Sequence, residues 1–184
     1  MKFSTREIIL GAMFTSMAVI QALLLRFLGA MVIPFSLMPF IAILAGALLG
    51  ARGGAISMLV YVLMGLIGLP VFEKPPYGGI AYLLQPTFGF LLGFVAAAYV
   101  VGKIKPRSGH SMLRYILAAL GGILIIYVVG LPYIFAILSF YLGQATSALQ
   151  VIKLACLPFI GADFVKAILA AILAATVIRR VQAS

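Results

Sequence analysis

The stretch "IILGAMFTSMAVIQALLL", from Ile8 to Leu25, contains no charged residue. An α-helix needs about 20 predominantly apolar residues to cross the hydrocarbon core of a bilayer. The apolar core of a secretory signal peptide is shorter, about 7 to 15 residues, and is usually followed by a small-x-small cleavage site. The length of this run therefore predicts a first membrane helix that is retained in the protein.

The rest of the chain has the same character. Its 184 residues are 65% hydrophobic and 9% charged, and its mean hydropathy is +1.28. A soluble domain is about half apolar and a quarter charged. Because no hydrophilic stretch is long enough to fold separately, the sequence predicts a single integral membrane domain over residues 1–184, embedded in the lipid bilayer.

Six apolar runs predict the transmembrane helices of an all-α membrane protein. They cover residues 8–28, 39–50, 54–69, 82–102, 113–138 and 159–178. Their length and the absence of strict alternation favour helices over strands. The second and third runs are short and meet at "GARGGA", residues 50–55, where we predict a tight turn.

The basic residues predict the orientation, because six spans place both termini on one side of the membrane. Nine basic residues lie on that side: Lys2, Arg6, Arg52, Lys103, Lys105, Arg107, Arg114, Arg179 and Arg180. The other side has Lys74, Lys153 and, near the end of the first helix, Arg26. The positive-inside rule then predicts that both termini are cytoplasmic. Basic residues at the ends of apolar runs do not form the stripe that binds nucleic acid, so no nucleic-acid partner is expected.

The sequence offers little chemistry for catalysis. Cys156 and His110 are the single cysteine and histidine, so a disulfide or a metal cluster is not expected. We interpret Cys156 as a small packing residue and His110 as a loop residue. Paired carboxylates, a Ser-His-Asp set and a phosphate-binding loop are all missing; "GKIK" at Gly102 lacks the earlier glycine and the later hydroxyl of that loop. The prediction is a protein that is not an enzyme and carries no cofactor or metal.

Two opposite charges interrupt the last apolar run, "LPFIGADFVKAILAA", residues 157–171. Asp163 and Lys166 are three residues apart and share one helical face near the outer end of the span. Three interpretations of this pair are open: a structural ion pair, part of an ion relay in a secondary transporter, or a substrate site that opens outward. In the third case Asp163 would accept N–H donors and Lys166 would meet a carboxylate or carbonyl. Shallow placement favours the third interpretation, but position alone does not decide between them.

The connection "GLIGLPVFEKPPYGGIAYLLQPTFGF", residues 65–90, is expected at the same outer face. Its turn-forming residues are typical of an ordinary structured loop. Aromatic walls with a few polar groups are also what a small-ligand site requires. The candidate residues are Glu73, Tyr77, Tyr82, Gln85, Thr87 and Phe88, with Tyr127 from the fifth span.

Small residues on the first helix predict a close contact with another helix. Gly11 and Thr15, and likewise Ala12 and Ser16, are four residues apart. Such pairs let a second helix approach closely in a membrane. That helix belongs either to this chain or to a separate subunit.

These segments together resemble the BioY family over effectively the whole chain. The resemblance is carried by "GLPVF", "QPTFGFLLGF" and the Asp-Lys helix, with "IPFSL" at residues 33–37 and "AGALLGARGGAIS" at residues 45–57. BioY proteins are the biotin-specific substrate-capture (S) subunits of energy-coupling factor (ECF) vitamin transporters. The resemblance implies a six-helix S-component-like bundle with cytoplasmic termini and an outward vitamin site.

The resemblance also implies partners and roles. An S subunit works with a transmembrane coupling subunit and two ATPase subunits in the cell membrane, and Gly11, Ala12, Thr15 and Ser16 would form the docking surface. The Asp and Lys of the last helix belong to the family's biotin site, and they match Asp163 and Lys166 here. On this basis we expect Asp163 and Lys166 to hold the polar ends of the ligand and Tyr82, Phe88 and Tyr127 its apolar body, with Gln85 and Thr87 as further substrate-binding residues. The loop from Pro70 to Gly79, with Val71, Phe72, Glu73 and Tyr77, would close over the ligand.

The chain departs from the family pattern at "QPTFGF", where G-P-T-G-G-Y is common, and at Glu73, where a small residue is common. The added large side chains could reshape the pocket. The alternatives are therefore an S subunit for another small carboxylate such as lipoate, a stand-alone secondary transporter, or a structural membrane subunit that binds no ligand.

Overall fold

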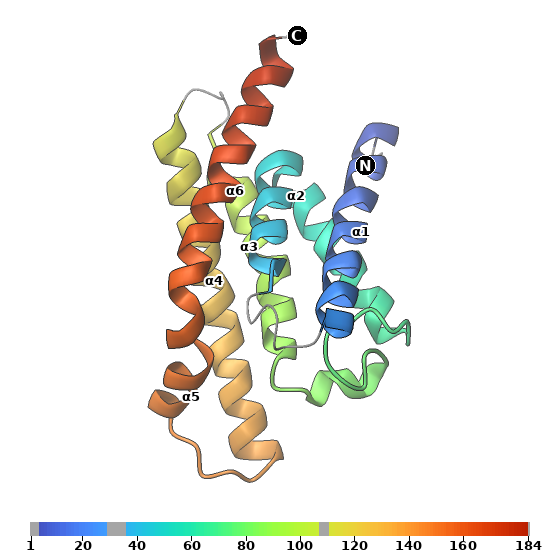
Figure 1. Cartoon of the computed structure of the whole chain (residues 1–184), viewed down its shortest axis with the longest axis vertical. Coiled ribbons are helices and arrows are strands. Elements are labelled where there is room, and N and C mark those ends of the chain that lie inside the picture. The colour runs from blue at the N-terminus through green and yellow to red at the C-terminus, as the bar shows by residue number, and fades with distance from the viewer. Residues whose placement is uncertain (1–3, 29–35, 107–110, 184) are drawn as a thin grey trace.

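The computed structural model of the chain describes residues 4–28, 36–106 and 111–183, and this part is helical without strands. Its elements are α1 (Thr5–Leu28), α2 (Met38–Leu66), the 3₁₀-helix η1 (Ile80–Leu84), α3 (Phe88–Ile104), α4 (Met112–Ala136), the π-helix η2 (Ile137–Tyr141), α5 (Ala148–Ala155) and α6 (Leu157–Ala183). Figure 1 shows the long helices side by side in a bundle. The predicted all-α class is confirmed. Lys2, Arg107, His110 and residues 33–35 of "IPFSL" lie outside the described residues.

The helices have the length and composition of membrane spans. Among the described residues, four helices are long and apolar enough to cross a bilayer, Thr5–Phe27, Met38–Leu66, Met112–Tyr141 and Leu157–Val181, and the apolar helix Phe88–Ile104 is shorter. Large apolar side chains also face outward, for example Leu124 and Leu169, each more than half exposed. The chain is therefore a membrane protein. The start of α1 and the end of α6 lie at one end of the bundle (Figure 1), and the assignment of that end to the cytoplasm stays a prediction.

The helix α2 is bent at the first residue of the predicted turn. Gly50 has φ 79° and ψ 177°, a conformation outside the helical region that glycine adopts at little cost. A Cβ added at Gly54 would lie 2.7 Å from Gly46 Cα, although eight residues of straight helix span about 12 Å. The two halves of α2 therefore pack against each other, as expected for two short helices that meet at a tight turn.

Several boundaries differ from the sequence-based expectation. The fourth run was expected to be helical from residue 82, but Tyr82 lies in η1 and α3 begins at Phe88. Pro86 lies between them, and a proline disfavours helical backbone at the residue before it. The short helix α5 was not predicted; Ser147 and Gln150 form a capping box at its start. The fifth run, residues 113–138, was expected as one helix across Pro132, and α4 does continue past this proline to Ala136.

Small residues allow the helices around the Asp-Lys pair to pack closely. On α6, five alanines are at most 1% exposed: Ala167, Ala170, Ala171, Ala174 and Ala175. Between α3 and α4, a Cβ added at Gly93 would lie 2.9 Å from the carbonyl oxygen of Ile126. This close approach fixes the distance between α3 and α4, the helix that carries Tyr127.

Candidate functional site

Asp163 and Lys166 lie at the centre of a small polar cluster. Lys166 Nζ is 2.8 Å from Asp163 Oδ1, and the side chains of Lys166 and Asp163 are only 12% and 8% exposed, respectively. The Tyr127 hydroxyl donates to Asp163 Oδ2 at 2.7 Å, and Lys166 Nζ also donates to the carbonyl oxygen of Ser36 at 2.8 Å. Both charges are thus compensated by each other and by hydrogen bonds, which a buried ion pair requires.

Two helices and the residues just before α2 position this cluster. The spacing of Asp163 and Lys166 puts them on one face of α6, while Tyr127 comes from α4 and Ser36 precedes α2. The Tyr127 ring packs edge-on against Phe90 of α3, with 6.0 Å between the ring centroids. A side chain at Gly130 would collide with Phe90. The sequence predicted Tyr127 as a site residue, but it did not predict Ser36 or Phe90.

Polar contacts continue from this cluster to the first helix. The Ser36 hydroxyl lies 2.9 Å from Glu73 Oε1, and Gln21 Nε2 of α1 donates to the same oxygen at 2.8 Å. Glu73 was predicted as a lid residue, and the structure joins it to α1. Gln21 was not predicted. The sequence signal for this contact was a glutamine inside the apolar run from Ile8 to Leu25, and the structure shows that its side chain is buried.

The predicted aromatic residues form a second cluster. The Phe72 and Tyr82 rings lie 4.2 Å apart, Tyr82 and Phe88 lie 6.4 Å apart, and Phe88 and Tyr133 lie 5.8 Å apart. These rings pack against one another in a row, from Phe72 through Tyr82 and Phe88 to Tyr133. Phe72 is fully buried, so this residue of the predicted lid belongs to the protein core.

The loop from Pro70 to Gly79 is held down at several points. The Tyr61 hydroxyl donates to the carbonyl oxygen of Val71 at 3.2 Å, and Gln85 Nε2 donates to that of Pro75 at 3.0 Å. The Arg26 guanidinium lies 3.7 Å from the centroid of the Tyr77 ring. Gln85 therefore contacts the loop. The Thr87 hydroxyl is buried.

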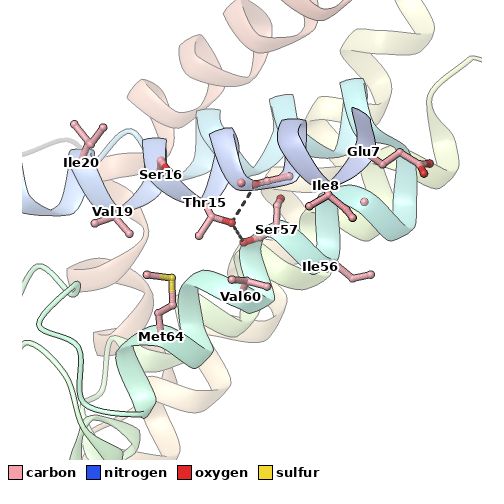
Figure 2. A pocket seen from close by; sticks show the side chains of 13 residues that line it. Glu7, Ile8, Thr15, Ser16, Val19, Ile20, Ile56, Ser57, Val60 and Met64 are labelled. Carbon is pink, nitrogen blue, oxygen red and sulfur yellow. Dashed lines mark hydrogen bonds between the residues drawn. The ribbon is translucent and has the colours of Figure 1, made fainter. Parts of the chain in front are cut away.

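The predicted docking residues lie along a groove between α1 and α2, with a volume of about 680 Å³. Figure 2 shows Thr15 pointing across it toward Ser57. Thr15 Oγ1 lies 2.8 Å from the Ser57 carbonyl oxygen and 3.1 Å from that of Gly11. Thr15 is buried, whereas Ala12 and Ser16 are exposed. Thr15 thus joins α1 to α2, and Ala12 and Ser16 remain accessible on α1.

Neither Cys156 nor a group of metal-ligating side chains adds a reactive site in the described part of the chain. Cys156 is buried, as expected for a packing residue. Burial, and then the Asp163 carboxylate, raise the pKa of its thiol. In the described part of the chain, no three His, Cys, Asp or Glu side chains come together to hold a metal ion.

Comparison with known proteins gives consistent matches along the whole chain. The model of the BioY family matches residues 1–183. The "Probable biotin transporter BioY" of Lysinibacillus sphaericus is 40% identical over 172 residues, covering 93% of this chain and 86% of that protein. The "Biotin transporter BioY" of Thermotoga maritima is 33% identical over 169 residues, covering 92% of this chain and 94% of that protein.

A solved structure has the same fold. It is the S-component for biotin from an ECF-type ABC transporter, and it superposes with a TM-score of 0.66 at 23% identity, covering 96% of this chain and 94% of that chain. At this level of identity the likeness concerns the arrangement of the helices. The expected S-component-like bundle is therefore confirmed.

Proposed function

The chain belongs to the BioY family, and from this premise we propose that it is the biotin-binding S subunit of an ECF transporter. It would capture biotin at the outer face of the cell membrane, as one integral domain with both termini in the cytoplasm. The relatives it matches are transporters, and the role proposed here is likewise binding and transport rather than catalysis.

The polar cluster of Asp163, Lys166 and Tyr127 carries the proposal. Biotin offers two ureido N–H donors, a ureido carbonyl and a carboxylate, joined by an apolar ring and chain. A carboxylate has about four acceptor positions, and an ammonium group has three donors. Asp163 and Lys166 can therefore meet donors and acceptors of one ligand at the same place. The Lys166 and Asp163 side chains are only 12% and 8% exposed. Hydrogen bonds to a ligand are therefore stronger here than they would be in water.

Aromatic residues would enclose the apolar body of the ligand. Tyr127 is the best-placed wall, because its hydroxyl contacts Asp163 while its ring packs on Phe90. We retain Tyr82 and Phe88 as further walls, with Gln85 and Thr87 beside them. Ligand pockets typically combine such apolar walls with a few polar groups that fix orientation.

The loop from Pro70 to Gly79 would act as the lid. Its Glu73 contacts both Ser36 and Gln21, and the carbonyl oxygen of Ser36 accepts from Lys166. Movement of Val71, Glu73 or Tyr77 would require breaking the contacts that tie them to Tyr61, Gln21 or Arg26. The lid would thus be closed by many weak contacts, of the kind that open on microsecond to millisecond timescales.

ATP-driven transport would need partners, because the sequence contains no phosphate-binding loop. We propose a transmembrane coupling subunit and two ATPase subunits as these partners. The groove beside Gly11, Ala12, Thr15 and Ser16 would receive the coupling subunit, since it is lined mainly by apolar groups and small side chains permit close helix approach.

Calorimetric titration of the purified chain with biotin, and with lipoate for comparison, tests the proposal. Saturable biotin binding that is weakened in both Asp163→Asn and Lys166→Ala would support it. Lys153→Ala is the matched control, because Lys153 is an exposed lysine on α5. Binding of lipoate alone would keep the S-subunit role and change the ligand. Uptake that requires an ion gradient and no ATPase subunits would instead favour a secondary transporter.

A further inference from the structure

Besides the groove between α1 and α2, the structure has a second cavity. It is separate from the polar cluster of Asp163 and Lys166 and lies at the end of the bundle that holds both termini. It has a volume of about 710 Å³ and is lined by residues of α1, α2, α3, α4 and α6. Three of these residues are basic: Arg6 at the start of α1, and Lys103 and Lys105 at the end of α3. The rest of the lining is largely apolar, with side chains such as Phe14 and Leu48.

Among the described residues, no acidic side chain lines this cavity, and the chain has only three Asp and Glu residues in total. Each of them is engaged elsewhere. Glu7 accepts hydrogen bonds from Ser4, Glu73 is bound by Gln21 and Ser36, and Asp163 pairs with Lys166. An acidic group that compensates the positive charges of Arg6, Lys103 and Lys105 must therefore come from outside this chain's own side chains.

Lys105 has a structural role as well. Its ammonium group donates to the carbonyl oxygen of Ala47 at 2.7 Å, next to the bend of α2 at Gly50, where helical carbonyls lose their usual partners. Burial lowers the pKa of Lys105. Arg6 and Lys103 are exposed, and they are consequently the better probes of anion binding.

Tyr115 supplies a second, independent observation. It lines the same cavity, is only 2% exposed, and its buried hydroxyl has no hydrogen-bond partner in the described part of the chain. Buried polar groups normally have a partner, and each exception needs an explanation. An acceptor oxygen in the cavity, reached by a small side-chain movement, would supply the missing partner.

We propose that this cavity binds an anionic phospholipid, with the phosphodiester near Arg6, Lys103 and Tyr115 and the acyl chains along the apolar lining. The site faces the leaflet beside both termini, and basic pockets between membrane helices are typical sites for anionic headgroups. The combination of cations and a largely apolar wall selects a lipid over a free anion. The inference does not depend on the identity of the transported ligand.

The test is native mass spectrometry of the full chain in detergent, titrated with phosphatidylglycerol, with phosphatidylcholine of the same acyl chains, and with inorganic phosphate. We expect preferential binding of phosphatidylglycerol. Each basic residue near an anionic headgroup contributes about 1 kcal/mol, or about fivefold, so Arg6→Gln combined with Lys103→Gln should weaken binding by about 25-fold. Arg114→Gln, which removes one exposed charge at the same end outside the cavity, should change it by less than about twofold.

Tyr115→Phe provides a variant that should fold, because it removes a hydroxyl without a partner. It should weaken phosphatidylglycerol binding about fivefold, the usual size of one hydrogen bond. Equal binding of both lipids, full competition by inorganic phosphate, or unchanged affinity in both the double variant and Tyr115→Phe would overturn the proposal. If the double variant and Tyr115→Phe bound phosphatidylglycerol normally but no longer assembled with the partner subunits, the proposal would also be wrong. The cavity would then receive an acidic segment of a partner instead.

Discussion

The interpretation of Asp163 and Lys166 can be tested by comparing the loss of one charge with the loss of both. Removal of one partner of a buried ion pair leaves an uncompensated charge and costs about 3 to 5 kcal/mol. The Lys166 and Asp163 side chains are 12% and 8% exposed, so we expect the lower end, about 3 kcal/mol, for Lys166→Met or Asp163→Asn alone. For a chain of this size, that corresponds to a fall in Tm of about 6 to 12 °C.

The double variant Asp163→Asn with Lys166→Met should recover most of this stability. Replacement of a whole buried pair by uncharged groups of similar volume is often neutral or stabilising, and the amide oxygen introduced by Asp163→Asn could still accept from Tyr127. Its Tm should therefore return to within about 4 °C of the unmodified protein. Biotin binding should not recover, since two charge-assisted hydrogen bonds, each about 1.5 to 3 kcal/mol, are lost. We expect a Kd at least about 100-fold higher.

Thermal unfolding in detergent measures the first effect and calorimetric titration with biotin the second, with Lys153→Met as the control. A double variant that is stable and binds biotin normally would show that the pair is purely structural, and the site assignment would be wrong. A double variant as unstable as the single ones would contradict the reasoning about charge compensation.

Three further predictions concern the surroundings of this pair. Tyr127→Phe should raise the Kd for biotin by about tenfold, because it removes the hydroxyl that donates to Asp163 Oδ2 at 2.7 Å; an unchanged Kd in calorimetry would contradict this. Gly54→Ala should lower the free energy of unfolding by about 1 to 3 kcal/mol through overpacking, since its Cβ would lie 2.7 Å from Gly46 Cα. Thermal unfolding checks this, and an unchanged Tm would argue against close contact of the two halves of α2. Ser16→Trp should reduce uptake more than about tenfold while the Kd for biotin changes less than about twofold, because Ser16 lines the groove proposed for docking; equal uptake in whole cells would place docking elsewhere.

The sequence alone was enough for the class of protein and for the local part of the site. Only helices and closed barrels can span a bilayer, so long apolar runs without alternation lead directly to a helical membrane protein. The bend of α2 was predictable because Gly50 begins a glycine-rich turn. The proximity of Asp163 and Lys166 was predictable as well, since residues three apart on one helix always share a face.

The partners of that pair depended on the tertiary structure. Lys166 meets the carbonyl oxygen of Ser36 across 130 residues, Asp163 meets Tyr127 across 36, and Gln21 meets Glu73 across 52. Such contacts depend on how closely the helices approach and how they are rotated, which is set by packing between the helices, for example at the buried alanines of α6. The same packing brings Arg6, Lys103 and Tyr115 around one cavity. Sequence periodicity indicates which face of a helix is apolar, but the helices that cover that face are determined by the complete bundle.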